Sequence, residues 1–440
     1  MAWDRGTLNL LLVAALCAGC RNDGGSGDGG SSSGSGSTAA STTGGESVGT
    51  PTGSSTEAVS TTGSTTESTE TTLTESTTGV PTGTDTADAT CDDGVVVAGE
   101  LCFGPHQVLE AGRSTAALAV ADFDGDGRLD IAAGHDDGLS VRFGDGEGGF
   151  EEVLEVLGGT SVLALAVGNL DENDTPDLLV AEPIADRVGV FFATEDRDFD
   201  IGPDFISGAG PRALAVGDFD DDGNDDLAVA HEVDGDIRVA LSNGDGTFSL
   251  AASFAAGTSP LGLAAADLNA SGGHDLAVAN FGSGNISTYL SLGDAFDAPV
   301  SYAAQAGPRD VLLADFNGDG ALDLAAIHQD AATAGFWPGG GTGALGDRTL
   351  VQIAANPRDA HAADIDGDGT PDMIVALQAG NAVGVLRGDA EDGLGPQEAF
   401  PAMSDPTAVA TGDFNLDGAV DVVTGSAGPQ GGIAIILATP

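Results

Sequence analysis

The chain has 440 residues, with 69 Asp plus Glu against 13 Lys plus Arg, which gives a formal net charge of -56. So few cationic side chains argue strongly against nucleic acid or an anionic membrane surface as a partner, and they favour inorganic cations. The length allows two or three average domains or one large β domain.

Residues 1–20 have the pattern of a bacterial export signal. An apolar run from Leu8 to Leu16 follows Arg5 and is too short to span a bilayer as a mature helix. The sequence LCAGC after it resembles a lipoprotein processing box, although Cys17 stands where that box usually has an aliphatic residue. The resemblance implies lipidation of Cys20 and anchoring to the cell envelope. Cleavage followed by secretion is the alternative.

Residues 21–90 consist almost entirely of Gly, Ser, Thr, Glu and Ala. A segment with so few large apolar residues cannot bury enough surface to offset chain entropy, so we expect a disordered tether. The segment 91–102 then carries Cys91 and Cys102. In an exported protein these two cysteines are expected to form a disulfide, with two free thiols as the alternative.

A nine-residue acidic motif occurs seven times after residue 102. The copies are DFDGDGRLD from Asp122, NLDENDTPD from Asn169, DFDDDGNDD from Asp218, DLNASGGHD from Asp267, DFNGDGALD from Asp315, DIDGDGTPD from Asp364 and DFNLDGAVD from Asp413. Successive copies start 47, 49, 49, 48, 49 and 49 residues apart. An apolar residue stands 19 residues before each start: Phe103, Phe150, Phe199, Phe248, Phe296, Leu345 and Leu394. One structural unit is therefore repeated seven times.

Each unit has the pattern of four short strands, which in the first copy are residues 117–123, 129–135, 139–146 and 150–157. The acidic motif lies between the first and second strands. Four strands per unit without helical periodicity predict an all-β fold, a seven-bladed β-propeller over residues 103–440. The last unit ends after three strands, and the segment from Phe103 has the fourth-strand pattern. Pairing of these two segments would close the ring.

The units resemble FG-GAP or VCBS repeats, as in the α-subunit propeller of integrins and in many bacterial surface proteins. The resemblance covers residues 103–440 and implies calcium in the loop between the first two strands of each blade. The chemistry agrees, since oxygens at positions 1, 3, 5, 7 and 9 of the motif can surround one Ca²⁺ when position 6 permits a sharp turn. The predicted ligands, with position 7 contributing its carbonyl, are Asp122, Asp124, Asp126, Arg128 and Asp130; Asn169, Asp171, Asn173, Thr175 and Asp177; Asp218, Asp220, Asp222, Asn224 and Asp226; Asp267, Asn269, Ser271, Gly273 and Asp275; Asp315, Asn317, Asp319, Ala321 and Asp323; Asp364, Asp366, Asp368, Thr370 and Asp372; and Asp413, Asn415, Asp417, Ala419 and Asp421.

The seven loops differ in the number of carboxylates that they offer. Blades one, three and six have four, blades five and seven have three, and blades two and four have two. We therefore predict up to seven calcium ions with five strong sites and weaker binding in blades two and four. The alternative for any loop is an acidic turn without an ion.

A second set of residues repeats at positions expected on the opposite face. His135, His231 and His328 stand 13 residues after their motif starts, where blades two and four have Glu182 and Asn280. Arg212, Arg309 and Arg358 each stand six residues before a motif start. These histidines and arginines could form a donor ring for an anionic or hydroxyl-rich ligand at the channel mouth, by analogy with other propellers. Repeated turn residues without a ligand are the alternative.

No H-E-x-x-H motif, phosphate-binding Gly loop or nucleophile with its base is found. The sequence favours a monomeric, non-enzymatic, calcium-stabilised binding or adhesion propeller that recognises a glycan or protein and touches a membrane only through an N-terminal lipid. An extracellular polysaccharide lyase or hydrolase is the second hypothesis. A structural spacer of an envelope assembly is the third.

Overall fold

The structure is a computed structural model that describes residues 101–439, except for 112, 152, 172, 174, 294, 391–392 and 428–430. The predicted signal, the tether, the lipidated Cys20 and one predicted disulfide partner, Cys91, lie outside the described residues. Cys102 is buried. The pairing of the two cysteines stays a prediction.

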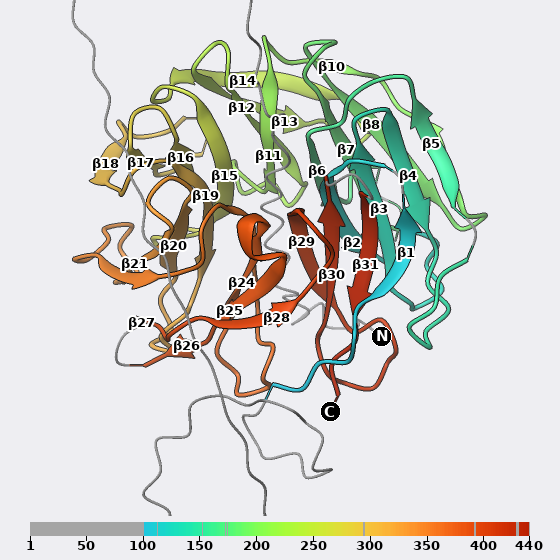
Figure 1. Ribbon diagram of the computed structural model, residues 1–440. Helices are drawn as coiled ribbons and strands as arrows, with labels where there is room; N and C mark the ends of the chain where they lie inside the picture. Colours follow the sequence, from blue (N-terminus) through green and yellow to red (C-terminus); the bar gives the residue numbers. More distant parts are fainter. Residues whose placement is uncertain are drawn as a thin grey trace, which may run out of the picture. The chain divides into compact units, whose positions relative to one another are not determined.

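The described residues form seven antiparallel sheets around a common axis (Figure 1). Blade one contains β2 (Thr115–Ala121), β3 (Asp130–His135), β4 (Gly138–Arg142) and β5 (Leu154–Gly158), from the inner to the outer strand. The next blades, in the same order of strands, are β6 (Ala164–Gly168), β7 (Asp177–Glu182), β8 (Arg187–Thr194) and β10 (Phe205–Ile206) in blade two; β11 (Pro211–Gly217), β12 (Asp226–His231), β13 (Asp236–Ser242) and β14 (Phe248–Ala255) in blade three; and β15 (Pro260–Ala266), β16 (Asp275–Asn280), β17 (Asn285–Tyr289) and β18 (Val300–Ala303) in blade four.

The remaining three blades repeat this order. They are β19 (Pro308–Ala314), β20 (Asp323–His328), β21 (Thr333–Trp337) and β22 (Thr349–Gln352) in blade five; β23 (Pro357–Ala363), β24 (Asp372–Leu377), β25 (Ala382–Leu386) and β28 (Glu398–Pro401) in blade six; and β29 (Pro406–Gly412), β30 (Asp421–Ser426), β31 (Gly432–Ile436) and β1 (Gln107–Ala111) in blade seven. In addition, β9 (Asp198–Ile201) pairs with β8, and β26 (Gly388–Asp389) pairs with β27 (Gly393–Leu394). The helical part of the described chain is one 3-10 turn, Gln378–Gly380, and no described helix is long and apolar enough to span a membrane.

The ring closes in blade seven. β1 pairs antiparallel with β31, with Gln107 opposite Ile435, and Phe103 forms a further bridge to Ala438. The first strand of every blade also contacts the first strands of both neighbouring blades. The predicted seven-bladed propeller and its closure by the two ends of the repeat region are confirmed.

The first three strands of each blade are buried on both sheet faces because neighbouring blades cover them. β3 is buried along its whole length, whereas β14 in the outer position consists of half-buried and exposed residues. This arrangement explains why the inner strands are continuous apolar runs rich in Ala, Val and Leu rather than alternating patterns. It also positions each acidic loop at the end of a rigid, buried strand.

The apolar residue that precedes each motif by 19 residues connects two blades. Phe150 in blade one packs edge-on against Phe414 in the loop of blade seven, with ring centroids 5.6 Å apart. Phe296 in blade four packs in the same way against Phe219 in the loop of blade three, at 5.9 Å. The outer hairpin of one blade therefore covers the acidic loop of the preceding blade, and the edge-to-face contact between the two rings stabilises this junction.

Candidate metal-binding loops and channel-mouth residues

Six of the seven acidic loops share one pair of hydrogen bonds. In blade one, the Asp122 carboxylate accepts the backbone amides of Asp126 at 3.0 Å and Gly127 at 2.8 Å. Gly127 has a φ of 85°, which favours glycine at this position of the turn. The first motif residue makes the same two bonds in blades three to seven: Asp218, Asp267, Asp315, Asp364 and Asp413. The loops are thus closed by their own first carboxylate.

Three loops bring carboxylates together closely enough to hold one metal ion. In each, one ligand oxygen from each of three aspartates lies within 4.8 Å of the others. The clusters are Asp122, Asp124 and Asp130; Asp218, Asp220 and Asp226; and Asp364, Asp366 and Asp372. Because Ca²⁺ binds oxygens at about 2.3–2.6 Å, two of its ligands lie at most about 5 Å apart. The three loops predicted to have four carboxylates therefore fit the ion.

The ninth motif residue also has a structural role that the sequence analysis missed. The two carboxylate oxygens of Asp130 accept the backbone amides of Phe123 and Gly144, each at 2.8 Å. Asp177, Asp226, Asp275, Asp372 and Asp421 make the equivalent pair of bonds. This carboxylate ties the loop to the turn that follows the third strand. The sequence contained a signal for this structural role, since position 9 of the motif is Asp in all seven copies.

Burial makes these clusters unfavourable without a cation. It raises the pKa of Asp130 to about 7, against the lowering effect of the two amides, and the nearby Asp124 and Asp122 raise this pKa further. Burial likewise raises the pKa values of Asp226 and Asp372 to about 6. A bound divalent ion would favour the ionised carboxylates and reverse this effect.

The loop of blade two is satisfied by its own side chains. The Asn169 amide group donates to the carbonyl oxygen of Asn173 at 2.5 Å, and the Thr175 hydroxyl donates to the Asn173 side chain at 2.7 Å. In blade four, Asp267 closes the loop, and the Asn269 amide group lies 3.5 Å from an Asp275 oxygen. Each of these two loops lacks a third carboxylate, and weaker calcium binding there stays a prediction.

Two arginines from outside the nine-residue motifs contact the acidic loops, in addition to Arg128 within the blade-one motif, and the sequence analysis did not place them there. Arg197 of blade two binds Asp124 and Asp126 in blade one. Arg387, which follows β25, pairs with Asp366 at 3.0 Å in blade six. Only the order of the blades around the ring brings Arg197 to a loop more than 70 residues away.

The three histidines of the predicted donor ring are buried inside their own blades. His135 lies between Ser140 at 2.7 Å and Thr115 at 3.3 Å, and is fully buried, as His231 and His328 are. Burial lowers the pKa values of His135 and His328 to about 4, so these rings are neutral at pH 7. Packing between strands and blades removes all three rings from water.

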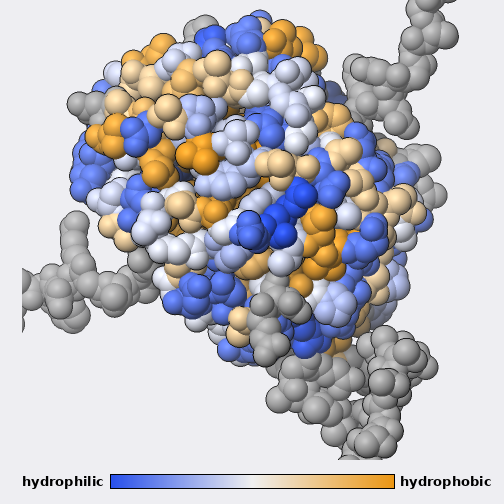
Figure 2. All heavy atoms as spheres, turned by 90° about the vertical axis from the view of Figure 1, so that its left-hand side faces the viewer, coloured by the Kyte–Doolittle hydropathy of each residue, from blue (hydrophilic) through white to orange (hydrophobic). Residues whose placement is uncertain are grey.

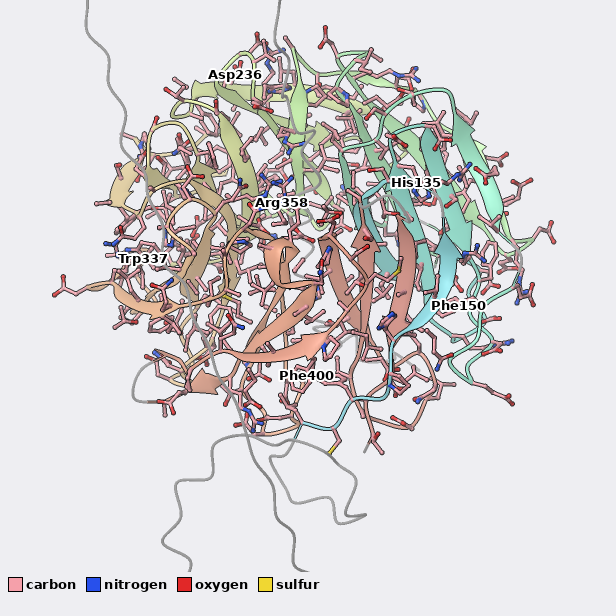
Figure 3. The ribbon with its side chains drawn as sticks, in the orientation of Figure 1. His135, Phe150, Asp236, Trp337, Arg358 and Phe400 are labelled. Atoms are coloured by element: carbon pink, nitrogen blue, oxygen red, sulfur yellow. The ribbon has the colours of Figure 1, made fainter. Side chains whose placement is uncertain are left out.

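The arginines of the predicted ring are also buried, and two of the three come together. Arg309 donates from Nε to the carbonyl oxygen of Arg358 at 2.6 Å, and both guanidinium groups approach the side-chain oxygen of Gln329, at 3.0 and 3.4 Å. Figure 3 shows Arg358 near the middle of the ring in that view. Arg212 instead lies 3.6 Å from Glu232. A ligand role for the six residues stays a prediction.

Next to these arginines lie two buried aspartates that were not predicted. The Asp310 carboxylate accepts the amides of Val311 at 2.9 Å and Ala360 at 3.1 Å, and Asp359 accepts the amide of Val409 at 2.8 Å. These bonds link the first strands of blades five, six and seven. Burial raises the pKa of Asp310, and the Arg309 charge opposes that change.

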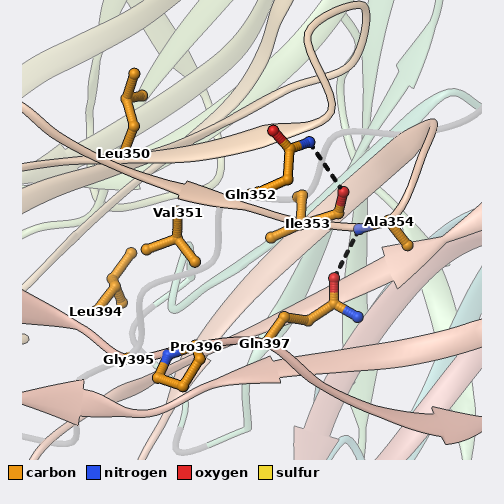
Figure 4. A pocket seen from close by; sticks show the side chains of 9 residues that line it. All are labelled: Leu350, Val351, Gln352, Ile353, Ala354, Leu394, Gly395, Pro396 and Gln397. Carbon is orange, nitrogen blue, oxygen red and sulfur yellow. Dashed lines mark hydrogen bonds between the residues drawn. The ribbon is translucent and has the colours of Figure 1, made fainter.

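A groove lies at the outer side of blades five and six (Figure 4). Its walls are β22 with the residues after it and the segment 394–397. Gln397 crosses the groove and accepts the backbone amide of Ala354 at 2.7 Å. On the surface shown in Figure 2, polar and apolar residues are interspersed. The side chain of Gln397 thus bridges the groove through its bond to Ala354.

A family model described as "FG-GAP-like repeat" matches residues 122–180, 218–278, 267–326, 315–375 and 364–424. No curated protein matches the chain. Among solved structures, BBS1N in complex with ARL6DN, soaked with lead, is similar at a TM-score of 0.55 and 14% identity, over 76% of this chain and 96% of that one. A catalytically inactive virginiamycin B lyase from Staphylococcus aureus with quinupristin is similar at a TM-score of 0.52 and 13% identity, over 76% and 99%. These likenesses show the fold alone, and the repeat matches extend over more than half of the chain, which therefore belongs to the FG-GAP-like repeat family.

Proposed function

We propose that the protein is a calcium-stabilised binding propeller that recognises a glycan or protein ligand outside the cell. The observation that supports the calcium part most directly is the recurrence of one arrangement in three blades: three aspartate oxygens within 4.8 Å of one another in a loop whose backbone is already closed. A site that needs little rearrangement loses little conformational entropy when an ion binds.

The first, third and ninth motif residues would hold the ion in blades one, three and six, and the fifth residue and the carbonyl at position 7 would complete the set. When bound, calcium supplies the positive charge that allows the carboxylates to remain ionised side by side. The loops then hold the first two strands of each blade together and support the outer hairpin of the next blade.

Calcium titration and thermal melting test this part. The protein should bind several calcium ions, and its melting midpoint should fall by many degrees in chelator, because ligands that bind only the folded state stabilise it. The variant D218N/D220N should lose one site, and D234N, in an exposed turn of blade three, is the matched control. Equal midpoints with calcium and with chelator would contradict the proposal.

For the ligand, the arginine pair Arg309 and Arg358 is the best-supported anchor. Both guanidinium groups approach the side-chain oxygen of Gln329, and groups of this kind donate hydrogen bonds to a carboxylate or a hydroxyl-rich glycan. A glycan array with and without calcium should identify the class. R309Q/R358Q should then reduce binding, with R348Q as the control for charge, provided that both variants melt as the parent does.

An enzyme on the same scaffold is the second candidate, since a lyase shares the fold. The observation in its favour is the buried pair Asp310 and Asp359 beside the arginines. Backbone amides already occupy these carboxylates, so we favour binding over catalysis. Turnover of a polysaccharide that depends on Asp310 would reverse this preference. A structural spacer, the third candidate, would show neither binding nor turnover.

Export and lipid anchoring at Cys20 belong to the same proposal. They rest on the N-terminal sequence pattern alone. The intact mass of protein extracted from the envelope tests them, and the same measurement under non-reducing conditions tests the disulfide between Cys91 and Cys102. A mature form without acyl mass would reduce the proposal to secretion.

A further inference from the structure

Arg197 stands at a backbone position where three other blades have glycine. Its φ is 62°, in the left-handed region. The residues that stand, like Arg197, 21 residues before the next motif start in blades one, three and five are Gly148, Gly246 and Gly343, with φ values of 81°, 74° and 77°. A residue with a side chain is strained in this conformation, whereas glycine is not. Contacts of the arginine side chain must offset that strain.

Those contacts are with carboxylates of blade one. Nε of Arg197 lies 2.6 Å from Asp124, Nη2 lies 3.0 Å from Asp126, and Nη1 lies 2.7 Å from Glu151. The guanidinium group also packs over the ring of Phe143 at 5.5 Å. All three of its nitrogens therefore face an acidic oxygen, and Asp124 is almost completely buried in this contact.

Two of these partners are the third and fifth residues of the blade-one motif, which are predicted calcium ligands. A carboxylate can accept a hydrogen bond and bind a metal ion at once, but a calcium ion bound to Asp124 would lie next to the guanidinium charge of Arg197, and the two cations would repel each other. A positive charge from the neighbouring blade thus occupies the part of the loop where calcium would draw these carboxylates together.

We propose that Arg197 is an intramolecular competitor for calcium in the loop of blade one. The proposal rests on the calcium binding proposed above. In the absence of calcium the arginine pairs with Asp124 and with Asp126, which Arg128 also contacts, and a calcium ion that binds these carboxylates must overcome the repulsion of the guanidinium charge. Blade one therefore binds calcium more weakly than its four carboxylates imply, and calcium loosens the arginine contact between blades one and two.

The variant R197G tests the proposal, because glycine suits the backbone at this position. We expect calorimetric titration to show that the affinity of one calcium site rises about tenfold. A rise of this size is expected when a cluster of partly exposed ion pairs no longer competes with the metal ion. R348Q is the matched control for net charge, since the contacts of Arg348 are with the ring of Trp337 and the carbonyl of Ala303 rather than with a carboxylate of an acidic loop. Its calcium affinities should stay unchanged.

Two further measurements assign the gain to blade one. In the D122N background, the increase caused by R197G should disappear. In chelator, R197G should melt below the parent because the ion pairs are lost, and in excess calcium this difference should vanish or change sign. An arginine that only holds the two blades together would lower the midpoint equally under both conditions.

The outcomes separate the two proposals. If the parent protein binds calcium and R197G leaves every affinity unchanged, the competitor role is wrong while the proposed function stands. If R348Q raises the affinity as much as R197G does, general electrostatics explains the gain and the competitor role is again wrong. If neither the parent nor R197G binds calcium, both proposals fail.

Discussion

The carboxylate of Asp130 accepts the backbone amide of Gly144 at 2.8 Å, across 14 residues of chain. The bond joins the acidic loop at the start of β3 to the turn after β4, so that a loop residue fixes the position of the outer hairpin. Because that hairpin also covers the loop of the preceding blade, the loops and the junctions between blades form one connected structure. A change in one loop is therefore expected to affect two blades.

Substitution of the ninth motif residue should destabilise the propeller even without calcium. D226N replaces one acceptor oxygen by an amino group that faces the amide of Phe219 or Ser242, so a buried donor loses its acceptor. A cost of about 1–3 kcal/mol in the free energy of unfolding is expected. Urea denaturation in chelator measures it. D221N makes the same chemical change at an exposed position of the same loop, and should leave the unfolding curve unchanged.

The contact between Phe219 and Phe296 should contribute to the junction of blades three and four. F219A removes a fully buried ring, and a loss of about 3–5 kcal/mol is expected. F296L introduces the residue that blades five and six have at the same offset, Leu345 and Leu394, and should cost less than about 1.5 kcal/mol. If both variants show equal losses by thermal melting, the aromatic pair does not have the role assigned to it.

The closing strand should protect the edge of blade seven. A variant that begins at residue 113 lacks β1 and exposes the edge of β31, which carries the apolar residues Ile433 and Ile435. Such an edge is a template for pairing with another chain, so a lower midpoint and self-association are expected in light scattering. A variant that begins at residue 101 keeps β1 and should remain monomeric. A monomeric, equally stable truncation would show that β1 is dispensable.

The repeat made the blades and loops predictable because its period, the turn residues and the carboxylates are all local in sequence. The repeat did not predict which residues of different copies contact each other. Arg197 reaches Asp124, and Asp310 bonds the amide of Ala360, only because blades lie side by side in a ring. The alignment of copies also placed His135 and His328 at one level of the fold without indicating whether they face water. Their burial follows from packing between blades.

Burial of these histidines should make the propeller sensitive to acid. Because the folded-state pKa values of His135 and His328, about 4, lie below the ordinary value of 6.5, their neutral forms stabilise the fold above pH 6.5. That contribution is lost as the pH falls from 6.5 towards 4, by about 3 kcal/mol for each histidine at most. The aspartates with raised pKa values act in the opposite direction, so the total pH dependence does not isolate the histidines.

The variant H135N/H328N does isolate them, because asparagine is the natural residue at the same position in blade four, where Asn280 bonds Ser287 at 3.1 Å. His135 faces Arg113 and Arg142, which oppose its protonation, and Asp137, which favours it; Arg348 opposes protonation of His328. The aspartates are common to both proteins, so the difference in melting midpoint between parent and variant reports the histidines alone. We expect the parent to lose stability relative to the variant between pH 6.5 and 4. Parallel midpoints across that range would mean that the histidines are protonated in the fold, and hence that water reaches them.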